Sequence, residues 1–137
     1  MIRYTTSLSG IDAADLAGPF FVGWPNAPDP TTHLELLRGS DHVVIAVHEG
    51  DDRVVGFVTA ITDGVLAAYI PFLEVVPDYQ GRGIGSELIR RLLEVIGPIY
   101  AVDAACDPEL QPFYEHLGLR PGTAVMLRNY ERQSGNA

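Results

Sequence analysis

A chain of 137 residues, 47% of them hydrophobic, is long enough to form one domain with a substantial core. Its net charge of −9 argues against nonspecific binding to nucleic acid, and its one cysteine, Cys106, excludes an intramolecular disulfide and a cysteine-rich metal site. The uncharged runs are too short or too broken to span a bilayer, and the first ten residues contain no apolar signal-peptide core, so we expect a cytoplasmic protein with no membrane partner.

The first third of the chain predicts a strand and two helices, at 2–6, 9–16 and 31–38. Ser9 is the expected N-cap of the first helix, and Thr31 or Thr32 is that of the second. Between the helices, proline and glycine interrupt residues 20–30, so no regular element is expected there. The aromatic residues of this segment either close over an apolar pocket or dock onto the core: Phe20, Phe21 and Trp24.

The middle of the chain predicts three strands, at 42–48, 53–62 and 65–76, joined by turns at 49–52 and 63–64. Pro71 cannot donate a ladder hydrogen bond, so we expect either a bulge or a locally unpaired stretch in the third strand. Apolar residues at helical spacing then predict an amphipathic helix over 84–96.

The last third predicts a strand at 99–105, a helix that follows the N-cap Asp107 and ends at Gly118, and a final strand at 123–130. We expect one domain over residues 1–130 and a frayed polar tail over 131–137. This order predicts an α/β fold with a mixed, mostly antiparallel sheet, helices on both faces and one right-handed β-α-β crossover.

The loop before the long helix contains three alternating glycines, Gly81, Gly83 and Gly85. Glycine lets a ligand approach the backbone closely, and the free N–H groups of a helix N-terminus favour an anion, so a phosphate is the expected occupant. A nucleotide P-loop would need a lysine, which the sequence lacks, and a dinucleotide fingerprint would need glycine in place of Ser86.

A third phosphate-loop pattern matches at every position. The loop Gln80-Gly81-Arg82-Gly83-Ile84-Gly85 follows the strand end Leu73-Glu74-Val75-Val76-Pro77, and the segment Phe113-Tyr114-Glu115-His116-Leu117-Gly118-Leu119 comes later in the chain. In these segments the sequence resembles the GNAT superfamily of acyl-CoA-dependent N-acetyltransferases, with Leu119 in place of the family's phenylalanine. The resemblance implies a GNAT-like fold in which two parallel strands splay apart around a coenzyme A site.

The resemblance also implies how acetyl-CoA would be bound. The backbone of the strand end would pair with the pantetheine arm, and the glycine loop would hold the pyrophosphate: Leu73, Glu74 and Val75 for the arm, and Gln80, Gly81, Arg82, Gly83, Ile84, Gly85 and Ser86 for the pyrophosphate. Asp107, which stands where the family often has asparagine and retains a capping role, and Tyr114 would also be among the residues that bind the cofactor. Tyr114 would be the catalytic partner of the departing thiolate, and an ordinary core tyrosine is the alternative.

Several groups are candidates for the base that accepts the amine proton. Glu74 would lie beside the thioester, where burial would raise the pKa of its carboxyl group, and a purely structural carboxylate is the alternative. Asp103, His33 and a chain of water molecules are the other candidates. Cys106 would permit an acyl-enzyme, but the family typically uses direct attack, and we expect a buried, inert thiol.

We therefore predict an N-acetyltransferase that acetylates an amine of a small molecule, with Phe20, Phe21 and Trp24 near the acceptor. The acidic net charge favours a cationic amine. A protein N-terminal or lysine acetyltransferase is one alternative, and a noncatalytic acyl-CoA-binding module is another. We expect no metal ion, and either a monomer or a homodimer.

Overall fold

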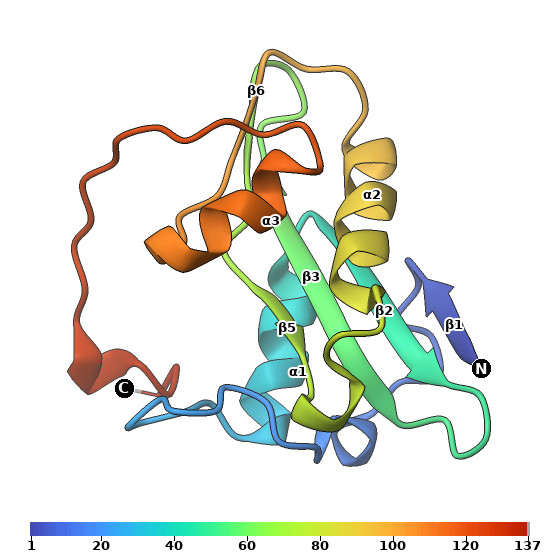
Figure 1. Cartoon of the computed structure of the whole chain (residues 1–137). Coiled ribbons are helices and arrows are strands. Elements are labelled where there is room, and N and C mark those ends of the chain that lie inside the picture. The colour runs from blue at the N-terminus through green and yellow to red at the C-terminus, as the bar shows by residue number, and fades with distance from the viewer. Residues whose placement is uncertain (137) are drawn as a thin grey trace.

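Successive side chains of β2 (His42–His48) enter two separate cores, one on each face of the sheet. Val44 and Ala46 pack in the core beneath α2 (Ile84–Ile96), and Val43, Ile45 and Val47 pack in the core beneath α1 (Pro30–Gly39). The computed structural model describes residues 1–136, and Figure 1 shows the sheet between these two helices. Helices on both faces of the sheet are thus confirmed.

The sheet is mixed and mostly antiparallel, as predicted. Its strands are β1 (Ile2–Thr5), β2, β3 (Val54–Thr62), β4 (Ala67–Tyr69), β5 (Leu73–Val75) and β6 (Ala101–Asp103). Their order is β1-β2-β3-β4-β6, and β5 lies off this path because it pairs with β3. Only the β4/β6 pair is parallel among these ladders.

The strand predicted at 65–76 is divided into β4 and β5 at Pro71. β4 pairs with β3 through Tyr69↔Ile61, and β5 pairs with it through Leu73↔Val58. Between these two pairs β3 moves on by three residues and the strand around Pro71 by four. The bend therefore contains one extra residue, as a β-bulge does. At the bend, the N–H of Ile70 donates to the carbonyl oxygen of Asp103 in β6 (2.8 Å), and beyond it β5 follows β3 alone. The predicted splay between two parallel strands begins here.

Two predicted helix caps are wrong. The first helical segment is the short 3-10 helix η1 (Ala13–Leu16), and its N-cap is Asp12, which forms a capping box with Asp15. α1 begins at Pro30, and its N-cap is Asp29, whose carboxylate accepts from the N–H of Thr32 (2.8 Å). In both cases an aspartate near the expected cap satisfies the first free amides.

The segments after β6 also differ from expectation. Asp107 precedes the 3-10 helix η3 (Pro108–Leu110) but makes no side-chain cap bond, and the helix that follows, α3, is short (Gln111–Glu115). The predicted strand at 123–130 is wrong, because residues 120–129 are exposed and pair with no strand of the described chain.

The tail is docked over its described residues. The 3-10 helix η4 (Tyr130–Arg132) forms there, and the side chain of Gln133 accepts from the N–H of Asn26 (3.0 Å). The prediction of a frayed tail is therefore wrong for residues 131–136, and residue 137 lies outside the described range. None of the helices in residues 1–136 is long and apolar enough to cross a membrane.

Candidate active site

The N-terminus of α2 has no side-chain cap. Its N-cap is Gly83, and the first intrahelical bond runs from the N–H of Glu87 to the carbonyl oxygen of Gly83 (3.1 Å). The N–H groups of Ile84, Gly85 and Ser86 therefore have no intrahelical acceptor. Because the helix dipole is positive at the same place, this terminus is suited to a phosphate or pyrophosphate.

Two glycines of the loop have a backbone conformation that other residues rarely adopt. Gly81 has a φ of +76° and Gly83 a φ of +82°, and no atom lies within 4 Å of the place that a Cβ would take at either residue. A Cβ at Gly85 would lie 3.5 Å from the ring of Phe113, which is ordinary van der Waals contact. Thus the turn needs Gly81 and Gly83 for their conformation, and the open space beside them is free for a ligand.

The side chains of Gln80 and Arg82 donate hydrogen bonds to backbone carbonyl groups that precede the loop. The side-chain amide of Gln80 donates to the carbonyl oxygen of Val75 (2.9 Å), and the guanidinium of Arg82 donates to that of Asp78 (2.9 Å). The guanidinium of Arg82 also lies 4.7 Å from the centre of the Tyr79 ring. The guanidinium of Arg82 is thereby held against the turn before the loop, and its contact with a pyrophosphate stays a prediction.

The outer edge of β5 is the place expected for the pantetheine arm. The N–H of Val76 donates to the carbonyl oxygen of Val55 in β3 (2.9 Å), and the peptide groups of Glu74, two residues earlier, face β3 in the same way. The peptide groups of Leu73 and Val75 face the opposite, open edge. The backbone of Glu74 is used in its pairing with β3, and the carbonyl oxygen of Val75 already accepts from Gln80. The remaining groups of Leu73 and Val75 lie on the open edge, and their pairing with the arm stays a prediction.

Tyr114 lies on α3 and packs against the core beneath α2. Burial raises the pKa of its phenol, and the nearby Cys106 and Tyr69 raise it further. Its hydroxyl has no hydrogen-bond partner among residues 1–136. A neutral phenol with an unused donor is what the predicted catalytic role needs.

Glu74 extends its carboxylate to the aromatic segment. Its Oε1 accepts from the N–H of Phe21 (2.8 Å), and Phe21 has a φ of +57°. Burial raises the pKa of the carboxyl group, and this hydrogen bond offsets part of the rise. The Oε2 atom has no partner within the described part of the chain, so one oxygen has a structural contact and the other is available.

The structure places the two other candidate bases in different surroundings. His33, expected near the substrate mouth, is only 1% exposed and lies among the rings of Phe20, Phe21 and Phe57, at centroid distances of 5.0, 5.0 and 4.5 Å. Burial lowers its pKa to about 4. Asp103 is the ladder partner of Tyr69, and the two residues line a shallow depression beside the turn between β3 and β4. The described residues also contain no group of three or more His, Cys, Asp or Glu that could hold a metal ion.

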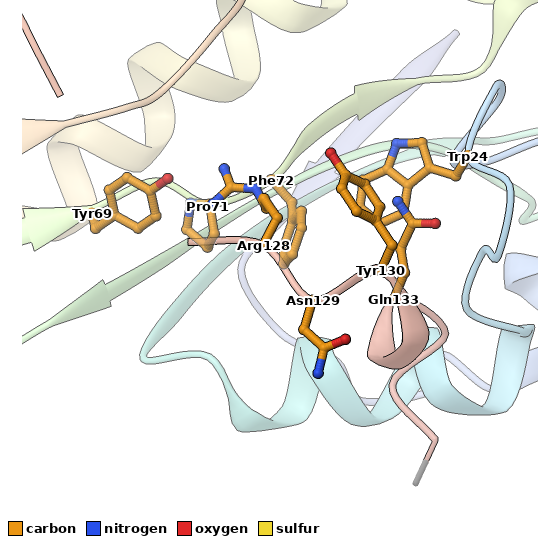
Figure 2. Close-up of a pocket in the computed structure, with 8 residues that line it drawn as sticks. All are labelled: Trp24, Tyr69, Pro71, Phe72, Arg128, Asn129, Tyr130 and Gln133. Carbon is orange, nitrogen blue, oxygen red and sulfur yellow. The ribbon is translucent and has the colours of Figure 1, made fainter. Parts of the chain in front are cut away.

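A cavity of about 530 Å³ opens at the bend between β4 and β5 (Figure 2). It lies between the bend and the C-terminal residues, and it is lined by Trp24, Tyr69, Pro71, Phe72, Arg128, Asn129, Tyr130 and Gln133. Figure 2 shows Tyr69 and Trp24 at two ends of this row, with Pro71, Phe72 and Arg128 between them.

Of the aromatic residues predicted to contact an acceptor, only Trp24 lines the cavity. Phe20 and Phe21 pack in the core beneath α1, which is the docking expected as the alternative, and their contact with an acceptor stays a prediction. The C-terminal lining residues were not predicted as site residues, and the apolar segment at 123–130 was their one signal in the sequence. Tyr69 was not predicted either, because nothing in its strand distinguishes it from an ordinary exposed tyrosine.

Comparison with known proteins agrees with this geometry. The model of the acetyltransferase (GNAT) family matches residues 12–119, a range that contains the glycine loop and Tyr114. The crystal structure of a candidate acetyltransferase from Deinococcus radiodurans R1 is 46% identical, with a TM-score of 0.95 over 99% of this chain and 94% of that one. The structure of AAC(6')-Iy with a CoA bisubstrate analogue shares the fold, at 20% identity and a TM-score of 0.64 over 94% of this chain and 96% of that one.

Among curated sequences, the histone acetyltransferase TAP1 of Glycine max is 29% identical over 109 residues, which are 71% of this chain and 46% of that protein. The chain spans about half the length of the curated relatives it matches. The family model covers most of the chain, and the fold and the glycine loop agree with it. The chain therefore belongs to the acetyltransferase (GNAT) family.

Proposed function

We propose that the protein is an N-acetyltransferase that transfers the acetyl group of acetyl-CoA to an amine of a small molecule. The observation that carries this proposal is the uncapped N-terminus of α2 behind a glycine loop, in a chain whose residues 12–119 match the acetyltransferase (GNAT) family. The cavity lined by Trp24, Tyr69 and Phe72 supports a small acceptor, because it offers such a molecule a place on the same chain.

In this proposal acetyl-CoA brings the activated acetyl thioester, and the chain would bind its pyrophosphate, its pantetheine arm and its sulfur. The free N–H groups of residues 84–86 and the cation of Arg82 would hold the pyrophosphate. The open edge of β5, at Leu73 and Val75, would align the pantetheine arm as an added strand. Tyr114 would donate a hydrogen bond to the sulfur as it leaves, because its raised pKa keeps the phenol protonated at neutral pH.

Glu74 is the proposed acceptor of the amine proton. Its Oε2 has no partner among residues 1–136, and its raised pKa makes it a better base than an exposed carboxylate. Glu74 does not line the cavity, so the proton would reach it through water rather than directly.

The cavity favours a compact acceptor with an apolar part and an acidic group. Trp24, Phe72 and Tyr130 give it aromatic walls. Arg128 has no carboxylate partner in the described chain, and its hydrogen bonds go to the carbonyl oxygen of Leu127 (3.5 Å) and the sulfur of Met126 (3.3 Å). A carboxylate or phosphate on the acceptor would form an ion pair with this guanidinium.

A panel of acceptors tests the proposal through release of coenzyme A. It should contain amino acids, amino-sugar phosphates, arylalkylamines and lysine peptides, because a similar protein is named a histone acetyltransferase. We expect small amines with an acidic group to be acetylated fastest. Faster acetylation of a lysine peptide would favour a protein acetyltransferase. Calorimetric binding of acetyl-CoA without turnover of any acceptor would favour a noncatalytic binding module.

A further inference from the structure

Arg82 is the only cationic residue of the glycine loop, residues 80–86, and the chain holds it without neutralising its charge. Its guanidinium lies 4.7 Å from the centre of the Tyr79 ring and donates to the carbonyl oxygen of Asp78 (2.9 Å). No carboxylate of residues 1–136 forms an ion pair with it. Because a guanidinium has several N–H donors, most of them stay free for a ligand.

The ring that Arg82 lies against is itself fixed in place. Tyr79 ends the 3-10 helix η2 (Pro77–Tyr79), and its N–H donates to the carbonyl oxygen of Val76 (2.9 Å). Its side chain packs against the core beneath α2. The ring of His48, at the end of β2, lies 6.0 Å from the Tyr79 ring, and His48 Nδ1 is hydrogen-bonded to the carboxylate of Asp51 (3.0 Å). The Tyr79 ring is therefore a fixed surface for an exposed arginine.

This kind of contact orders an arginine and leaves its charge available. An exposed arginine loses side-chain freedom when it binds a ligand, and ordering it beforehand lowers that cost. A carboxylate partner would order it too, but would compete with an anionic ligand for the same N–H groups. The face of an aromatic ring attracts the cation without occupying those groups.

We propose that Tyr79 is a positioning residue, which orders Arg82 for the pyrophosphate of acetyl-CoA. Tyr79 acts through Arg82, by the face of its ring, and its hydroxyl group is not needed. The inference rests on the proposed function for the identity of the ligand, and on the contacts of Arg82 and Tyr79 for the role of the ring.

A second arginine–tyrosine stack supplies a matched control. The guanidinium of Arg91, on α2, lies 4.6 Å from the centre of the Tyr4 ring, and Tyr4 also packs against the core beneath α2. Arg91 differs from Arg82 because it forms an ion pair with Glu87 (2.6 Å). Tyr4→Leu therefore removes a similar ring from a similar place, but from an arginine whose charge is already paired.

A double-mutant cycle, measured by calorimetry with acetyl-CoA, tests the proposal. Tyr79→Leu should weaken binding about threefold and Arg82→Gln about tenfold. In the Arg82→Gln background, Tyr79→Leu should weaken binding no further, because the side chain that it positions is gone. Tyr79→Phe retains the ring face and should bind like the wild type, and so should Tyr4→Leu.

The cycle separates positioning from a purely structural role. If Tyr79→Leu only disturbed the turn before the loop, it would weaken binding equally in both backgrounds, and that result would overturn the proposal. Binding by Tyr79→Phe that is as weak as that by Tyr79→Leu would overturn it too. A wild-type chain that does not bind acetyl-CoA would contradict the proposed function as well, whereas wild-type binding with additive losses would contradict the positioning role alone.

Discussion

The carboxylate of Glu74 accepts a hydrogen bond from the N–H of Phe21 (2.8 Å), and Phe21 has a φ of +57°. A left-handed conformation at a residue other than glycine costs about 1–2 kcal/mol, so this bond holds a strained turn in place. β5 and the aromatic segment, separated by 53 residues in the sequence, are thereby joined beside the cavity. Two substitutions separate this structural role from proton transfer.

Glu74→Gln should retain the turn but lose the base, because the amide oxygen of glutamine can still accept from Phe21. With the pKa of Glu74 raised, wild-type kcat/KM should rise with pH as the carboxyl group deprotonates, and Glu74→Gln should remove this rise and lower the rate about 10²-fold. Glu74→Ala should in addition raise the KM of the acceptor. A pH–rate profile of Glu74→Gln that matches the wild type would eliminate Glu74 as the base.

Tyr114→Phe should lower kcat about 10²-fold, since only the hydrogen bond to the leaving sulfur is lost. Its affinity for acetyl-CoA should stay within about twofold of wild type, because the phenyl ring retains its packing against the core beneath α2. Steady-state kinetics and calorimetry measure these two effects separately. Unchanged turnover would leave Tyr114 as an ordinary core residue.

Gly83→Ala should weaken binding of acetyl-CoA by at least tenfold, because alanine disfavours the left-handed turn and its methyl group enters the open space beside the amides. Gly97→Ala is the control at the other end of α2, where the surroundings are equally open. Gly97 has a φ of +80° and a ψ of −175°, a conformation that residues other than glycine hardly adopt, so this change should cost more stability than the roughly 1 kcal/mol expected for the left-handed Gly83. Only Gly83→Ala should alter the affinity measured by calorimetry, although Gly97→Ala destabilises the fold more. If the two variants bind acetyl-CoA with equal affinity, the loop is not part of the binding site.

We predict that the buried His33 lowers the stability of the folded chain in acid. Its pKa in the folded chain is about 4, below the ordinary value of 6.5, so the unfolded chain binds more protons between these values. Its contribution is therefore fully present above pH 6.5 and falls by about 3 kcal/mol as the pH drops to 4. Urea unfolding at several pH values should show a shallower acid slope for His33→Leu. The slope of Thr59→Val, a change at a buried residue that does not titrate, should resemble that of the wild type.

Local signals predicted the loop and the helix to which binding of the donor is assigned. The glycines at 81, 83 and 85 and the amphipathic pattern of 84–96 lie in one continuous segment, so neither depends on how distant parts of the chain meet. Pro71 likewise marked an irregularity that the structure shows as a register shift between β4 and β5.

The acceptor side depends on contacts between distant segments. Trp24, Phe72 and Tyr130 meet only after folding, and a linear pattern does not place them around one cavity. His33 was misplaced because its spacing on α1 suits either a surface or a buried position, and the rings of Phe20 and Phe21 decide which. The segment 123–130 has strand composition, but a strand forms only where a partner edge is within reach.

Because α2 has no side-chain cap, a bound ligand would supply the hydrogen-bond acceptors that the first amides of the helix lack. A bound pyrophosphate would take the place of the Ser, Thr or Asp side chain found at most helix starts, since Gly83 offers none. Occupancy of the site and thermal stability should therefore rise together, by about 2.7 kcal/mol at a ligand concentration of 100 Kd. Hydrogen exchange at the amides of residues 84–86 should slow with the same dependence on ligand, which makes the start of α2 a reporter of the loaded state.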